Sequence, residues 1–216
     1  ADDGRIVVTR FEEVPDQAPL TADVTAQSPA DRSFEARMDD LAAELGVAIE
    51  ADEIVSHDTK HAIVNFASRR GIDTIVAEHE PLRLRSRLLG DPVDWVVRHA
   101  PCDVLLVDNL GYEQPAEVAL AGTDRPHPLA ARVAGSIAAA HDGDLSLWYP
   151  GDGTAVETYR DELAEALPVQ VTATRTDGGD RTAPDLVVRR DSTRLLSGDV
   201  PLSNPGCTTI TVYPRD

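Results

Sequence analysis

Lysine is almost absent from this chain of 216 residues, because Lys60 is the only one and every other basic residue is arginine. Aromatic residues make up only 4%, and 20 basic residues stand against 38 acidic ones, a net charge of −18. Molar salt screens the mutual repulsion of so many carboxylates, so this composition is typical of a protein from a halophilic cytosol. An intrinsically disordered acidic chain is excluded, because 42% of the residues are hydrophobic and they fall in short runs.

Three further features of the composition narrow the class of protein. No run of about 18 apolar residues is present, so no segment of this sequence is expected to span a membrane. The chain has no basic stripe to neutralise phosphates, so a nucleic-acid partner is not expected. Its two cysteines, Cys102 and Cys207, indicate a reducing interior rather than a disulfide framework.

Short apolar runs alternate with helical patterns along the whole chain. Several runs are unbroken Val, Ile and Leu, as in parallel strands that are covered on both faces. We expect strands at 5–11, 48–55, 74–77, 103–108, 117–121, 144–149, 170–174, 185–188 and 208–213. We expect helices at 31–45, 59–70, 92–99, 128–140 and 154–167. This alternation predicts an α/β fold of doubly wound, mostly parallel sheets with right-handed crossovers.

The sequence also contains an internal repeat. Cys102 and Cys207 each follow a turn with proline and each directly precede a β-branched or leucine-rich strand. The chain therefore divides into two domains, 1–111 and 112–216, of about 105 residues each. The first has four predicted strands and the second five, so the first lacks its opening strand and helix. Because the first strand of a doubly wound sheet is central, we expect the natural chain to continue before Ala1.

The end of the first repeat resembles a known family. Residues 74–80 and 88–107, with His99-Ala-Pro-Cys102 followed at once by a Val-Leu-Leu-Val strand, are similar to the closing half of a universal stress protein domain. The resemblance covers residues 5–108 well and 116–213 in outline. It implies two five-stranded sheets of the adenine-nucleotide α-hydrolase-like type, the first without its opening strand and helix.

Nucleotide-binding members of this family carry the pattern Gly-x2-Gly-x9-Gly-(Ser/Thr), in which backbone amides close on phosphates. The pattern falls on Ala77, Glu80, Gly90 and Asp91, so only one glycine is kept, and His79 lies in the same loop. Glu80 and Asp91 would repel a triphosphate, and Asp91 is well placed to cap the following helix. The resemblance thus implies a degenerate nucleotide loop at these five residues. No cofactor is expected, with ATP or AMP as the alternative ligand.

No other motif indicates catalysis or metal binding, and we expect neither catalytic residues nor a metal. His57 and His61 are four residues apart and could share a metal if both were helical, but Ser56 or Asp58 is the expected helix cap there. The indole of Trp95 departs from the apolar face of its short helix, so it either packs at an interface or stays partly exposed. The second repeat shows no glycine loop and is expected to be a structural partner.

Residues 78–109 are also similar to the cytoplasmic tails of archaeal amino-acid permeases and related cation-coupled transporters. This resemblance implies a non-catalytic regulatory or assembly module at the cytoplasmic face of the membrane, with a covalently attached upstream membrane domain. The implied partners are the two domains themselves, as a pseudo-dimer, and a second copy in a homodimer. The alternative is a stand-alone cytoplasmic universal stress protein that binds an adenine nucleotide. A hydrolase or transferase has less support, because a fold alone does not supply chemistry.

Overall fold

The computed structural model describes residues 4–15, 29–78, 92–111, 114–122, 126–149, 154–175, 184–190 and 207–215. It contains two compact units, residues 1–70 and 71–216, which are described separately below. This division differs from the repeat boundary predicted between residues 111 and 112, which stays a prediction.

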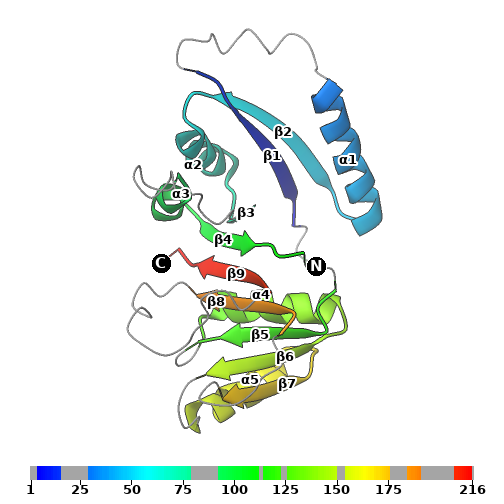
Figure 1. Cartoon of the computed structure of the whole chain (residues 1–216), viewed down its shortest axis with the longest axis vertical. Coiled ribbons are helices and arrows are strands. Elements are labelled where there is room, and N and C mark those ends of the chain that lie inside the picture. Colours follow the sequence, from blue (N-terminus) through cyan, green and yellow to red (C-terminus); the bar gives the residue numbers. More distant parts are fainter. Residues whose placement is uncertain are drawn as a thin grey trace. The chain divides into compact units, whose positions relative to one another are not determined.

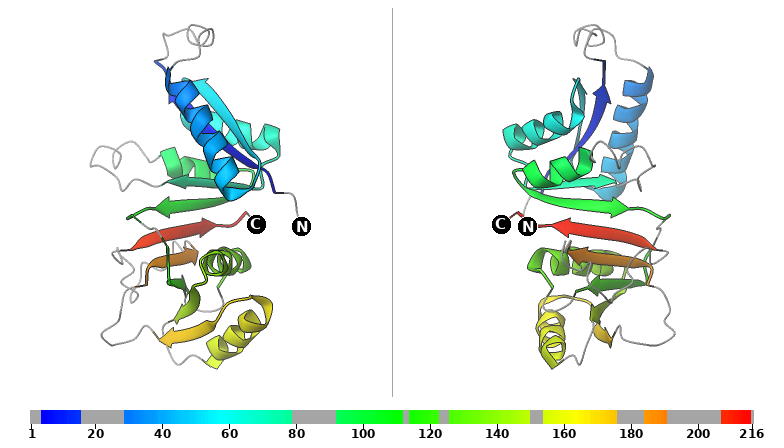
Figure 2. Two further views of the ribbon diagram at one scale, coloured as in Figure 1. Left: turned by 90° about the vertical axis from the view of Figure 1, so that its right-hand side faces the viewer. Right: turned by 60° about the vertical axis from the view of Figure 1, so that its left-hand side comes forward.

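The smaller unit is a two-stranded parallel sheet with a helix on each face (Figure 2). Its elements are β1 (Ile6–Glu13), α1 (Pro29–Leu45), β2 (Ile49–Ser56) and α2 (Thr59–Arg70). Gly46 and Gly71 end the two helices with φ of 65° and 60°, a left-handed conformation that glycine adopts without strain. Neither strand of this unit contains a fully buried residue. The sheet is therefore incompletely covered for a parallel arrangement.

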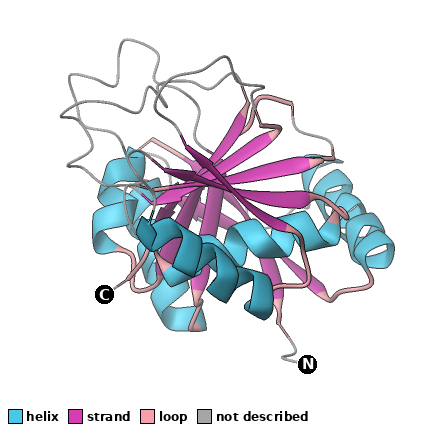
Figure 3. Ribbon diagram, turned by 90° about the horizontal axis from the view of Figure 1, so that it is seen from below, coloured by secondary structure: helices cyan, strands magenta, loops and turns pink. Residues whose placement is uncertain are grey.

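The larger unit contains the remaining elements. Its strands are β3 (Thr74–Glu78), β4 (Asp103–Asp108), β5 (Glu117–Ala121), β6 (Asp144–Tyr149), β7 (Val171–Arg175), β8 (Leu186–Arg190) and β9 (Thr208–Tyr213). Its helices are α3 (Pro92–His99), α4 (Pro128–Ala140) and α5 (Thr154–Ala166). The strands form one sheet in the order β3-β4-β9-β8-β5-β6-β7 (Figure 1). They fan out with the usual twist (Figure 3).

All neighbouring strands in this sheet are parallel except β4 and β9, which are antiparallel. Each of these two strands is the last of its repeat and follows its cysteine, Cys102 or Cys207. The sheet therefore joins the repeats through their final strands. Within the second repeat the order is β7-β6-β5-β8-β9, which places the repeat's opening strand β5 at the centre, as in doubly wound folds.

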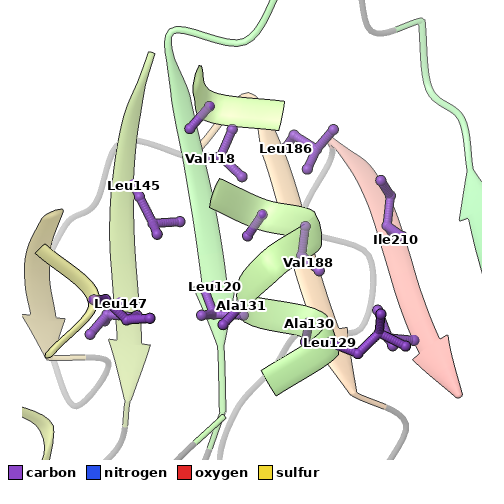
Figure 4. Packing of buried hydrophobic residues seen from close by; sticks show 14 of the residues in the cluster. Val118, Leu120, Leu129, Ala130, Ala131, Leu145, Leu147, Leu186, Val188 and Ile210 are labelled. Carbon is purple, nitrogen blue, oxygen red and sulfur yellow. The ribbon is translucent and has the colours of Figure 1, made fainter. Parts of the chain in front are cut away.

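The main core lies between the sheet and α4 and α5. Val118 and Leu120 on β5, Leu145 on β6 and Val188 on β8 are almost fully buried there, and α4 packs its small residues against them (Figure 4). Because side chains alternate along a strand, the residues between these face the other way. On that other face of β4, Val104 and Leu106 pack against α3 through Val93 and Val97.

The α/β class and the predicted elements are observed, with most bounds within two residues. The main difference is the grouping of strands. The nine strands of the described residues form sheets of two and seven, rather than one sheet for each repeat, because β4 pairs with β9 and because β5 has no counterpart among those residues in the first repeat. No helix in the described part of the chain is long and apolar enough to cross a membrane.

Candidate functional site

Doubly wound sheets bind ligands at the carboxyl ends of their strands, where the strand order reverses. In the second repeat the order reverses between β5 and β8, so the candidate site lies at the ends of these two strands. Ala121 on β5 is paired with Arg189 on β8, and the N–H of Gly122 donates to the carbonyl of Trp148 at 3.1 Å. The chain thus places backbone and two arginines, Arg189 and Arg190, at this edge.

The two arginines are functional candidates that the sequence reasoning did not identify. The Nε of Arg189 donates to the hydroxyl of Thr211 at 3.2 Å, which orients the half-buried guanidinium along β9, and Arg190 is exposed. The two arginines follow one another on the strand, so their guanidinium groups lie on opposite faces of the sheet, and each favours an anion over a cation on its own face. Their signal in the sequence is a pair of basic residues that ends an apolar strand in a strongly acidic chain.

In the first repeat, the matching position belongs to Ala77. Both final strands begin at the residue after the cysteine, and the strand registers align Asp103 with Thr74 and Thr208 with Leu186. By that correspondence Ala77 and Glu78 on β3 match Arg189 and Arg190 on β8. Ala77 is half-buried and packs, with Ile75 and with Val97 of α3, against the buried Val104 and Leu106. The structure therefore places Ala77 within a strand and a small apolar cluster.

The other four residues of the predicted loop, His79, Glu80, Gly90 and Asp91, lie outside the described residues. The expected capping role of Asp91 and the ligand role of His79 stay predictions for the same reason. Of the predicted site, the structure therefore locates only Ala77, at the end of β3 that precedes the loop.

On α3, the rings of Trp95 and His99 stack with their centroids 4.0 Å apart. The Nδ1 of His99 lies 2.7 Å from the carbonyl oxygen of Trp95, one helical turn earlier. Trp95 is half-buried and His99 exposed. This contact fixes the ring of His99 at the carboxyl end of the helix. The predicted interface role of Trp95 is untested.

His57 and His61 have separate local roles. The Nδ1 of His57 is 3.1 Å from the carbonyl oxygen of Val14. Asp58 caps α2, because its Oδ1 accepts the N–H of His61 at 3.2 Å and its Oδ2 lies 2.8 Å from the imidazole of His61. The hydrogen bond from His61 lowers the pKa of Asp58. The expectation of a cap here, named as Ser56 or Asp58, is thus confirmed for Asp58.

Among the described residues, no group of three or more His, Cys, Asp or Glu side chains could hold a metal ion. The cysteines are poor nucleophiles in this fold. Burial, reinforced by the nearby charge of Asp103, raises the pKa of the Cys102 thiol. Burial, followed by the charge of Asp185, raises the pKa of the Cys207 thiol. Both therefore stay protonated at neutral pH, whereas thiol chemistry needs the thiolate.

Comparisons with known proteins agree with the α/β fold described above. The model of the universal stress protein family matches residues 1–108. The fold is similar to the crystal structure of the cytoplasmic domain of a prokaryotic cation chloride cotransporter, with a TM-score of 0.64 and 12% identity. That match covers 98% of this chain and 85% of the other.

A second similar structure is a universal stress protein from Archaeoglobus fulgidus DSM 4304, with a TM-score of 0.51 and 11% identity. That match covers 98% of this chain and 87% of the other. At these identities the likeness concerns the fold alone. A comparison with curated proteins found no match. The family match covers half of the sequence, and the doubly wound sheet is the fold of that family. The chain belongs to the universal stress protein family.

Proposed function

We propose that this chain is a non-catalytic regulatory or assembly module of a membrane transporter, of the amino-acid permease type, at the cytoplasmic face of a salt-adapted archaeal cell. Three features support the proposal. The sequence of residues 78–109 resembles transporter tails, the fold is similar over 98% of the chain to a transporter's cytoplasmic domain, and the nucleotide pattern of the family is largely lost.

The observation that carries the proposal is the pairing of β4 with β9. Five residue pairs, from Val104 with Tyr213 to Asp108 with Thr209, connect the last strand of one repeat to the last strand of the other. Two flanking contacts extend the junction. The hydroxyl of Thr208 accepts the N–H of Leu110 at 3.1 Å, and the carboxylate of Asp103 accepts the N–H of Arg215 at 2.7 Å. A pseudo-dimer held in this way needs no ligand to assemble, which suits an assembly module.

The second candidate is a stand-alone universal stress protein that binds ATP or another adenine nucleotide. The family match and the likeness to the Archaeoglobus protein favour it. Ala77 disfavours nucleotide binding, because a packed alanine within a strand replaces the first glycine of the loop. The charges of Glu80 and Asp91 would add repulsion toward a triphosphate.

Equilibrium titration with ATP and with AMP, in molar KCl, separates the two functions. The module proposal expects no saturable binding up to millimolar nucleotide. Micromolar binding accompanied by protection of residues 79–91 from hydrogen exchange would instead establish the nucleotide-binding function. Arg189→Ala is the matched control, because it removes a cation at the corresponding position of the second repeat. A nucleotide signal that vanishes in this variant would assign binding to the second repeat.

The transporter context has a separate test in the gene. If the proposal is correct, the reading frame upstream encodes about ten to twelve apolar segments of about 20 residues each. An upstream reading frame without such segments contradicts the transporter role and leaves the family assignment intact.

A further inference from the structure

The start of α4 is capped by a histidine. His127 precedes Pro128 with an extended backbone, φ −64° and ψ 139°, and its carbonyl oxygen accepts the N–H of Ala131 at 3.1 Å. Its Nδ1 accepts the N–H of Leu129 at 3.2 Å. A helix leaves its first four N–H groups without partners inside the helix, and proline at the first position removes one of them. The imidazole of His127 therefore satisfies the next N–H group along the chain.

This hydrogen bond depends on the protonation state of the ring. A neutral imidazole has one nitrogen that donates and one that accepts, whereas a protonated imidazole donates from both. Because the Nδ1 of His127 accepts, the ring hydrogen lies on Nε2. Uptake of a second proton would remove the acceptor, and it would place a positive charge at the end of the helix that already carries the positive pole of the helix dipole. The cap and a protonated ring are therefore mutually exclusive.

Three other histidines make contacts of the opposite kind. The Nδ1 atoms of His57 and His99 each lie against a backbone carbonyl oxygen. The imidazole of His61 lies against the carboxylate of Asp58, which caps α2. In each of these contacts the ring nitrogen faces an oxygen that accepts, so the nitrogen carries a hydrogen. Proton uptake at the other ring nitrogen preserves such a contact, whereas at His127 it breaks the contact.

The turn that follows His127 is part of the main core. Leu129, Ala130 and Ala131 are 8%, 1% and 4% exposed and belong to the cluster between the sheet and the helices (Figure 4). Loss of the cap would therefore loosen packed apolar residues rather than a solvated helix end. Because α4 follows β5 in the chain, this turn also begins at the carboxyl edge of the sheet, where the candidate site of the second repeat lies.

The charged groups that the structure places around this cap are cationic. Arg190, at the end of β8, lies on the face of the sheet that α4 covers, because it is two residues beyond the core residue Val188. Arg132 lies in the first turns of α4 itself, and the end of β5 is apolar. Asp124 and Arg125 precede the cap in the chain and lie outside the described residues. The two described arginines oppose a further positive charge at the helix start.

The neighbouring elements α5 and β6 contribute tyrosines at this end. The hydroxyl of Tyr159 on α5 donates to the carbonyl oxygen of Pro126, directly before His127, at 3.4 Å. Tyr149 on β6 is buried in the same core. Phenols ionise only in alkaline solution, so neither supplies a negative charge to a protonated imidazole. The charged residues of α5 beside Tyr159 pair with one another; they are Glu157, Arg160 and Asp161.

We propose that His127 is a pH-sensitive cap on α4. In mildly acidic solution its imidazole takes up a proton, releases the N–H of Leu129 and loosens the first turn of α4. The arginines nearby disfavour a charged ring at the capping position, so the turn opens instead of holding the protonated ring in place. Acidity is thereby coupled to the carboxyl edge of the second repeat. The proposal is independent of the transporter role, because it concerns one helix end of the folded chain.

Hydrogen exchange measured by mass spectrometry tests this directly. It is compared at about pH 7.5 and about pH 5.5 in molar KCl, on either side of the usual titration range of an imidazole, with a correction for the intrinsic pH dependence of amide exchange. The peptide 127–134 reports the start of α4, and the peptide 144–149 on β6, which contains no histidine, is the internal reference. We expect the protection of the α4 peptide to fall at least about fivefold at the lower pH and that of the β6 peptide to change less than about twofold.

Matched variants separate the cap from the other histidines. His127→Asn keeps an acceptor that does not titrate, so its α4 peptide should be protected at both pH values. His127→Ala should lose the protection at both, and His99→Asn should keep the wild-type response to pH.

If the variants at position 127 do not fold, a long-range proton–nitrogen NMR spectrum of the wild-type chain gives the same information. It should show an unprotonated Nδ1 on His127 at about pH 7.5, and the Leu129 amide shift should follow the titration of that ring. Three results would overturn the proposal. One is a hydrogen on Nδ1 at that pH. Another is unchanged α4 protection on acidification. The last is a response to pH in His127→Asn as large as in the wild type.

Discussion

Val188 and Val76 occupy matched positions on β8 and β3, and only the first is buried. Both strands are short apolar runs that a residue-by-residue reading treats alike. β8 is buried because β5 and β9 flank it and α4 covers it, and β3 has only β4 beside it among the described residues. The comparison teaches that burial in a parallel sheet depends on the neighbours of a strand as well as on its own composition. It also gives matched variants for each contact that the second repeat makes.

The largest expected difference is between Val188→Asp and Val76→Asp. A carboxylate at position 188 would be buried without a partner, which costs more than about 4 kcal/mol of unfolding free energy. The same change at position 76 faces solvent and should stay within about 0.5 kcal/mol. Urea unfolding at a fixed molar KCl concentration, followed by tryptophan fluorescence, measures both. Equal losses in the 216-residue chain would show that the two strands have similar surroundings.

The next effect compares Gly143→Ala with Gly4→Ala. The new methyl at position 143 meets two backbone carbonyl oxygens that cannot move independently of β5, so we expect a loss of about 1–3 kcal/mol. At position 4 there is open space, and the change should be within about 0.5 kcal/mol. The same unfolding experiment checks this pair. A neutral Gly143→Ala would contradict the close approach of β5 to the turn.

A smaller difference is expected between Asp185→Ala and Asp73→Ala. Asp185 accepts two backbone N–H groups, and removing the carboxylate should cost about 1–2 kcal/mol, less than for a buried charged hydrogen bond because the residue is exposed. Asp185→Asn keeps one oxygen and should lose less. Asp73→Ala should be nearly neutral in the 216-residue chain. If Asp185→Asn and Asp185→Ala are equally harmful, the negative charge contributes more than the acceptor geometry.

Much of the fold could be predicted from the sequence, because the spacing of apolar residues and the glycines and prolines between them determine the helices and strands. The run from Asp103 to Asp108 and the helix from Pro92 to His99 have the predicted bounds. Counting back from the two cysteines also predicts that the first repeat lacks its opening strand and helix, and no counterpart of β5 lies among the described residues of that repeat. The grouping of the strands was not, because the pairing of β4 with β9 joins residues about a hundred positions apart, and no local signal specifies an antiparallel partner.

The candidate site was less predictable. The apolar run of residues 74–77 predicts the strand that holds Ala77, and β3 is observed there, whereas the ligand role of the loop stays a prediction. Asp185 and Gly143 were not singled out, because each acts on the backbone at the start of β5, far along the chain from Asp185. An aspartate or glycine in a turn has the same sequence signature whether or not such a contact exists. Only the three-dimensional register identifies which one supports a strand.

The smallest expected effect concerns the two cysteines that mark the ends of the repeats. Burial is the main cause of the raised pKa in both thiols, so the folded protein keeps them protonated at a pH where unfolded thiols, with a pKa near 9.0, ionise. A raised pKa in the folded state contributes stability that is complete below the unfolded pKa and is lost as pH rises through the folded one. Unfolding free energy should therefore be insensitive to these groups at neutral pH and fall at alkaline pH, with a shallower fall in Cys102→Ala.

The negative charge beside each thiol distinguishes the two repeats in this last test. After burial, the charge of Asp103 is the next cause of the raised pKa of Cys102, and the charge of Asp185 is the next cause for Cys207. Asp103→Asn keeps the oxygen that accepts the N–H of Arg215 and removes the charge. It should modestly speed the alkylation of Cys102 by iodoacetamide and leave Cys207 unchanged, as read by mass spectrometry of the two cysteine peptides. Equal acceleration at both sites would mean that the variant loosens the β4–β9 junction instead of changing a local charge. The two repeats would then differ in how readily they unfold locally, rather than in the electrostatics around their thiols.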